Sequence, residues 1–131
     1  MQRVVLDTNV LIAAAFRPAS RSATLVREIR EGRVGLVWDE PTRRESETLL
    51  RRIPPISWRD VSDLFRDEDR FPGSVDQRGF ESVPDPDDRK FAALAAAAGA
   101  TLVSLDAHLL EAGLGDRPRV VRPDVVLEEA R

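Results

Sequence analysis

PDPDDRKFAALAAAAGATLVSLD, residues 84–106, predicts a helix that leads directly into a buried strand. Asp and Pro at the beginning of the stretch are typical of the first turn of a helix. Phe91 and Leu94 lie on one face of that helix, and Gly99 is a typical residue at its end. The apolar run after the glycine ends in Asp106 and is typical of a strand buried on both faces. A helix joined to such a strand is part of the repeating unit of a parallel sheet.

The same alternation of strands and helices extends over the whole chain. Strands are predicted at residues 3–7, 34–38, 80–83, 101–106 and 119–123. Helices are predicted at residues 9–16, 22–32, 41–52, 57–69, 84–99, 107–113 and 124–130, the first of them with Asn9 as its N-cap. This order predicts a single α/β domain over residues 1–131, an α/β/α sandwich around a central parallel sheet.

The composition narrows the class of protein. A chain of 131 residues with 42% hydrophobic and 33% charged residues can form a packed core. It contains no cysteine, which excludes disulfides and thiolate metal sites. Asp7 and Asn9 interrupt the only apolar stretch near the start, and the uncharged run at 91–105 is too short to cross a membrane. We therefore expect a cytoplasmic protein without a membrane partner.

Charge is distributed unevenly along the chain. Residues 1–59 hold 11 Arg against 7 acids, a net of +4, whereas residues 60–88 hold 3 Arg against 10 acids, a net of −7. Arg17 and Arg21 lie in the predicted break after the first helix, where they are candidates for contact with nucleic-acid phosphates. The alternative interpretation is that both belong to a solvated loop.

Two of the predicted strands end in an acid, Asp7 after VVL and Asp106 after LVSL. In an open parallel sheet, ligands bind outside the carboxyl ends of the strands. Asp88 begins the long helix that returns to the sheet, and Glu45 lies one turn into the predicted helix at 41–52, so both fall on the same side of the sheet. We expect these four carboxylates to converge.

Four converging carboxylates repel one another unless a cation lies between them. At about 6 Å and an effective dielectric constant near 20, each pair costs roughly 3 kcal/mol. We expect no cation from the protein near Asp7, Asp88 and Asp106. Oxygen ligands without cysteine or clustered histidine favour Mg²⁺ or Mn²⁺ over zinc.

The motifs VVLDTNVLIAA, RRESETLL, DPDDRKFAALAAAAGATLVSLDAHLL and VVRPDVVL together resemble those of the PIN domain family. The resemblance covers nearly the whole chain and is weakest at residues 53–80. It implies a parallel α/β/α fold and an Mg²⁺- or Mn²⁺-dependent endoribonuclease that cleaves single-stranded RNA. Similarity to the toxins of bacterial toxin–antitoxin pairs further implies an antitoxin partner and a homodimer. The acidic quartet that it implies is Asp7, Glu45, Asp88 and Asp106.

Other residues are expected to support these acids. Thr8, Asn9, Asp85 and Ser104 are candidates to orient the carboxylates through hydrogen bonds, and Asp85 is also a candidate helix cap. His108 stands where the family often has another acid, so it is either a phosphate contact or a plain surface residue. The helix that carries Glu45 also carries Glu47, and the choice of Glu45 follows from its phase with Leu49.

Two other functions remain open from the sequence. A catalytically weak PIN fold would bind RNA as a scaffold without cutting it. A receiver-like signalling domain also gathers acids at strand ends, but it needs a lysine after the last strand, and the only lysine here is Lys90 in the predicted helix at 84–99.

Overall fold

A computed structural model describes residues 1–112, 114 and 117–130. Its four-stranded sheet has the order β2-β1-β3-β4, and every neighbouring pair is parallel. The strands are β1 (Arg3–Leu6), β2 (Gly35–Leu36), β3 (Thr101–Val103) and β4 (Val120–Val121). The α-helices are α1 (Thr8–Phe16), α2 (Arg21–Arg30), α3 (Glu40–Leu50), α4 (Arg89–Ala98), α5 (Ala107–Leu110) and α6 (Pro123–Glu129). The predicted α/β fold with a parallel sheet is confirmed.

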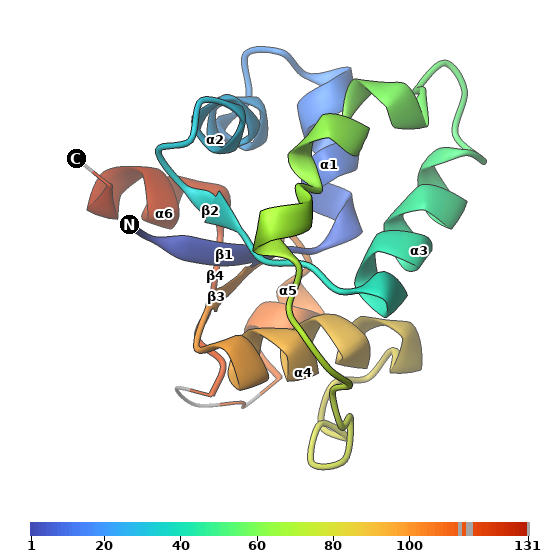
Figure 1. Cartoon of the computed structure of the whole chain (residues 1–131), viewed down its shortest axis with the longest axis vertical. Coiled ribbons are helices and arrows are strands. Elements are labelled where there is room, and N and C mark those ends of the chain that lie inside the picture. Colours follow the sequence, from blue (N-terminus) through green and yellow to red (C-terminus); the bar gives the residue numbers. More distant parts are fainter. Residues whose placement is uncertain (113, 115–116, 131) are drawn as a thin grey trace.

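Helices cover both faces of the sheet (Figure 1). On one face, Val4 and Leu6 of β1 pack with apolar side chains of α1, α2 and α6, such as Leu11 and Leu25. On the other face, Val5 of β1 packs with α4 and α5. Alternate residues of β1 thus enter two separate cores, as the period of two in a strand requires. The result is the predicted three-layer sandwich.

Helix α3 lies beyond the carboxyl ends of β1 and β2, and α4 starts near it and runs back along the sheet (Figure 1). The cap of α3 is Asp39, which accepts a hydrogen bond from the backbone N–H of Thr42. Gly99 ends α4 in the left-handed conformation at φ 64°, which glycine adopts without steric cost. The starts of α3 and α4 lie at the same edge of the sheet (Figure 1).

The predicted helix at 57–69 is wrong. Three short 3₁₀ helices occupy this segment: η1 (Trp58–Asp60), η2 (Ser62–Leu64) and η3 (Asp67–Asp69). The buried side chains Trp58, Val61 and Leu64 recur every three residues, which matches the 3.0 residues per turn of a 3₁₀ helix better than 3.6. The apolar pattern was real, but its period belonged to the tighter helix.

Smaller corrections concern single elements. No strand forms at 80–83, where turns carry the fully buried Val83 into the core beneath α4. The long helix at 84–99 is divided into the 3₁₀ helix η4 (Pro86–Asp88) and α4. The predicted helix at 107–113 ends at Leu110, and its last residue, Gly113, lies outside the described residues. In the part of the chain that the structure describes, no helix is long and apolar enough to cross a bilayer.

Candidate active site at the carboxyl edge of the sheet

Asp7 and Asp106 follow the neighbouring strands β1 and β3. The backbone N–H of Asp7 donates to the carbonyl of Val103 at 2.9 Å, so the pairing of the two strands continues up to the first acid. Two residues, the fully buried Ser104 and the partly buried Leu105, separate Val103, the last residue of β3, from Asp106. The parallel register therefore brings the two strand ends, and the acids that follow them, to the same edge.

Ser104 and Asn9 hold the Asp7 carboxylate in place. Asp7 is 5% exposed, and its Oδ2 accepts hydrogen bonds from Ser104 Oγ at 2.8 Å and from Asn9 Nδ2 at 3.2 Å. Burial raises the pKa of Asp7, and the hydrogen bond from Ser104 opposes that rise by favouring the charged form. The negative charge of Asp106 also raises the pKa of Asp7, to a smaller extent.

Asn9 lies inside α1 and is not its N-cap, so that prediction is wrong. Asp7 occupies the cap position, but its side chain makes no capping hydrogen bond because it faces Ser104. Asn9 instead joins the two strand ends: its Nδ2 donates to Asp7, and its Oδ1 accepts from the backbone N–H of Leu105 at 3.2 Å. The amide therefore aligns the acid of one strand with the segment that leads to the acid of the next.

Asp106 caps α5. Its Oδ1 accepts from the backbone N–H of His108 at 2.9 Å, and its own N–H donates to Ser104 Oγ at 3.0 Å. Ser104 thus contacts Asp7 through its donated proton and Asp106 through its oxygen. One buried hydroxyl couples the positions of two acids.

Asp88 approaches the same edge from the start of α4. Partial burial raises its pKa to about 7, and the charges of Asp7, Asp85 and Asp106 add to that rise. Asp88 makes no capping hydrogen bond, whereas Asp85 caps η4 by accepting from the backbone N–H of Asp87 at 2.9 Å. Asp85 is therefore the structural cap of this turn, and Asp88 is free of that role.

Glu45 and Glu47 point to different partners. Glu45 Oε2 lies 3.2 Å from Lys90 Nζ of α4, with both side chains about one fifth exposed. Glu47 pairs with Arg51 on its own helix at 3.1 Å, and Arg51 is largely exposed. Glu45 is thus the glutamate that faces α4, the helix that begins directly after Asp88.

A sequence model described as PIN domain matches residues 3–108, the range that contains all four of these acids. The chain belongs to the PIN domain family. A search of curated proteins finds no match to the chain.

PIN domains are typically nucleases, which usually use divalent metal ions and generally bind RNA. In this PIN domain the oxygen-only donor set and the raised pKa of Asp88 fit a hard divalent cation, because a bound cation would relieve the repulsion among the acids. Within residues 1–112, 114 and 117–130, no three acidic or histidine side chains already form a complete metal-binding group. Glu45 is held in an ion pair by Lys90.

Lys90 supplies a cation to Glu45, a contact that the sequence analysis did not anticipate. Lys90 reaches Glu45 from the turn that follows Asp88, across 45 positions of sequence. The sequence showed Lys90 as the only lysine, but its partner depends on how α3 and α4 pack. This contact neutralises one member of the predicted quartet.

A second residue that the sequence did not indicate is Ser46. Its Oγ lies 2.8 Å from Thr8 Oγ1, and both residues are buried. The Thr8 hydroxyl therefore ties the start of α1 to α3, and it forms no hydrogen bond with a carboxylate in the described part of the chain. The phase of Ser46, four residues from both Thr42 and Leu50 on the buried face of α3, is the signal that could have identified it.

The predicted nucleic-acid contacts are exposed. Arg17 and Arg21 line a pocket beside Leu105, one residue before Asp106. His108 is exposed on α5, and its backbone N–H is already bonded to Asp106. The two arginines therefore line a pocket whose wall includes the residue before Asp106, while His108 contributes a main-chain contact.

Proposed function

We propose that this PIN domain is an endoribonuclease that cleaves single-stranded RNA with Mg²⁺ or Mn²⁺ held by Asp7, Glu45, Asp88 and Asp106. The proposal is supported by the placement of three acids: Asp7 and Asp106 follow neighbouring parallel strands, and Asp88 precedes α4 at the same edge of the sheet. A divalent ion at such a site polarises a phosphoryl oxygen and lowers the pKa of water.

The chain's own residues would prepare this chemistry. Ser104 and Asn9 fix one oxygen of Asp7, which leaves the orientation of its carboxylate set before any ligand binds. Lys90 would release Glu45 to the ion, since an ammonium and a divalent cation compete for the same carboxylate. Asp88 must lose its proton to bind a metal, and its pKa of about 7 sets the pH range for that loss.

The experiment is cleavage of a single-stranded RNA with Mn²⁺ or Mg²⁺, with and without excess chelator. We expect cleavage that chelator abolishes, and Asp7→Asn should abolish it as well. Cleavage that survives both the chelator and the substitution would overturn the proposal. It would then come from a contaminant or from chemistry that does not use these acids.

The ion pair between Glu45 and Lys90 favours a second candidate, an RNA-binding scaffold of weak catalytic power. A scaffold would bind RNA equally well with chelator or metal and would not cut it. Membership of the PIN domain family removes the receiver-like alternative.

We further propose that the protein is a cytoplasmic toxin, that an antitoxin protein inhibits it, and that it forms a homodimer. The absence of cysteine supports a reducing compartment. Expression in a bacterial host should arrest growth for the wild type and not for Asp7→Asn, and light scattering should report twice the mass of one chain. Normal growth with an active enzyme, or a monomer at all concentrations, would contradict these points separately.

A further inference from the structure

A pocket of about 260 Å³ lies between α1, α2 and α6, next to the carboxyl edge of the sheet. Its charged lining consists of Arg17, Arg21 and Arg122, opposed by Asp124 alone. Three positive charges against one negative charge leave a net of +2. The side chains of Ala13 and Leu105 form an apolar part of the pocket wall.

The pocket adjoins the acidic site through two elements. Leu105 stands between Ser104 and Asp106, and its backbone N–H donates to Asn9. Ala13 lies four residues after Asn9 on α1, which is about 6 Å along the helix axis. One turn of helix therefore separates the residue that orients Asp7 from the wall of the pocket.

The three arginines are available for a ligand. Among the described residues, Arg17, Arg21 and Arg122 form no ion pair, whereas Arg30 pairs with Asp63 and Arg119 pairs with Glu129. All three are exposed at the surface. Guanidinium groups present a planar fork that matches phosphate oxygens, so three of them around one hollow favour an anion.

We propose that this pocket binds a phosphate and its sugar in the RNA strand, beside the phosphodiester that the acids would cleave. The inference rests on the proposed function and adds Arg122 and a defined subsite to it. Pockets that enclose a whole small molecule have volumes of about 300–1,000 Å³. This pocket, at about 260 Å³, is smaller, so its size suits a single unit of a polymer. The apolar wall suits the sugar, and the arginines suit the phosphate.

Binding and cleavage test this subsite separately. In an Asp7→Asn background, binding of a short single-stranded RNA is measured against salt concentration for Arg122→Ala and for Arg21→Ala. Each should weaken binding at least tenfold and reduce the salt slope by about 0.7 per lost phosphate contact. Arg122 makes no side-chain cap bond to α6, so its loss removes no capping, and Arg122→Gln is the second variant if Arg122→Ala does not fold.

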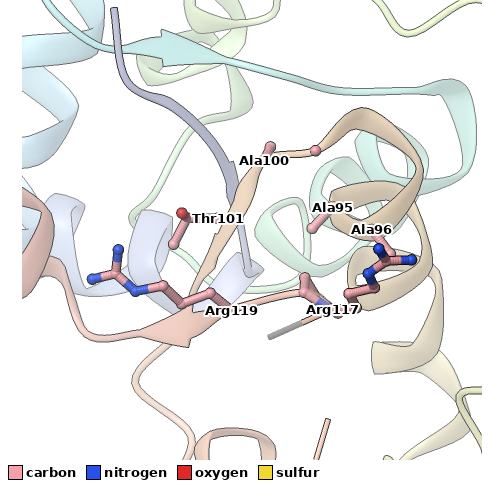
Figure 2. Close-up of a pocket in the computed structure, with 8 residues that line it drawn as sticks. Ala95, Ala96, Ala100, Thr101, Arg117 and Arg119 are labelled. Carbon is pink, nitrogen blue, oxygen red and sulfur yellow. The ribbon is translucent and has the colours of Figure 1, made fainter. Parts of the chain in front are cut away.

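The matched control is Arg117→Ala. Arg117 is an exposed arginine in a different pocket, which also contains Thr101 at the start of β3 and therefore lies at the opposite edge of the sheet (Figure 2). We expect its binding and salt slope to stay within twofold of the parent. Equal weakening by Arg117→Ala and Arg122→Ala, or no weakening by either, would overturn the subsite.

Cleavage assays on chains that keep Asp7 distinguish a failure of this subsite from a failure of the proposed nuclease function. The substrates are an RNA oligonucleotide and bis(p-nitrophenyl) phosphate, a diester too short to reach the pocket. Arg122→Ala should lower the ratio of RNA cleavage to small-diester cleavage at least tenfold, and an unchanged ratio would overturn the subsite. A wild type that cuts neither substrate would refute the nuclease, while the binding measurements would still decide whether the pocket holds RNA.

Discussion

The two edges of the sheet each carry a pocket lined by arginines, and they differ in what surrounds them. At the amino edge, a cavity of about 420 Å³ is formed by α4, the start of β3 and the segment before β4 (Figure 2). Arg119 there is held by Glu129 through hydrogen bonds of 2.6 and 2.8 Å. At the carboxyl edge, the cavity is smaller, about 260 Å³, but its arginines form no ion pair with described residues and its wall includes Leu105, the residue before Asp106.

The larger cavity therefore lies at the edge of the sheet away from the strand-end acids. Ligands of parallel α/β sheets bind at the carboxyl ends of the strands, where loops and helix starts gather polar groups. The amino edge has the larger hollow, but none of the described residues that line it is acidic. The predictions below test the role of the acids at the carboxyl edge, from the largest expected effect to the smallest.

Asp7→Asn should reduce metal-dependent RNA cleavage at least about 100-fold, because it removes a charged ligand while keeping the shape of the side chain. The measurement is kcat/KM on single-stranded RNA with Mn²⁺. Thr101→Ala at the amino edge is the control and should change kcat/KM less than threefold. Comparable losses in both variants would show that the two edges do not differ in function.

Glu45→Gln should lower cleavage by one to two orders of magnitude, and Glu47→Gln should leave it within a few-fold. The physical reason is that Glu45 faces α4 and Lys90, whereas Glu47 pairs with Arg51 on its own helix. Rates with Mn²⁺ for the two variants give the comparison directly. The reverse order would assign the site to Glu47.

Asp88→Asn should raise the melting temperature in chelator by several degrees, which corresponds to about 1–2 kcal/mol after solvent screening is taken into account. The pKa of Asp88 is raised to about 7 from its ordinary value of 3.8, so the folded state binds the proton more tightly than the unfolded state. The stability that this group contributes is fully present below pH 4 and is lost as the pH rises through about 7. The difference between the variant and wild type should therefore be near zero at pH 4 and largest above pH 7.

Added Mg²⁺ or Mn²⁺ should stabilise wild type and affect Asp88→Asn much less, because a ligand stabilises only the state that binds it. Asn is as good a cap as Asp, and Asp88 makes no capping bond, so the substitution has no cap to lose. A variant that melts below wild type in chelator at pH 8 would mean that Asp88 stabilises the fold and that the neighbouring acids do not repel its charge.

Lys90→Gln should lower the free energy of unfolding in chelator by up to about 1 kcal/mol, and the melting temperature slightly with it, because it leaves Glu45 without its partner. It should also increase the stabilisation by Mn²⁺, since the ion no longer competes with an ammonium. Thermal melts across a Mn²⁺ titration measure both effects. Arg51→Gln, which removes the partner of Glu47, is the matched control, and an identical response in the two variants would remove Lys90 from the site.

Much of the fold and part of the site could be predicted from the sequence. Local signals determined the alternation of strands and helices, because capping residues, glycine and apolar periodicity act within a few positions. They also placed Asp7 and Asp106 at strand ends, and a parallel sheet brings such ends to one edge whatever the details of packing. The prediction of an α-helix at 57–69 was wrong because periods of 3.0 and 3.6 residues per turn differ little over two turns.

Only the tertiary structure decided which distant side chains meet. The contact between Lys90 and Glu45, the hydroxyl pair of Thr8 and Ser46, and the pocket that joins Arg122 to Arg17 and Arg21 all depend on how helices pack against the sheet. The partners in the two side-chain contacts lie 45 and 38 positions apart, and nothing in the local sequence encodes their distance. Local sequence therefore determined that acids follow the strands of this PIN domain, whereas packing determined the lysine that pairs with Glu45 and the pocket that gathers the three arginines.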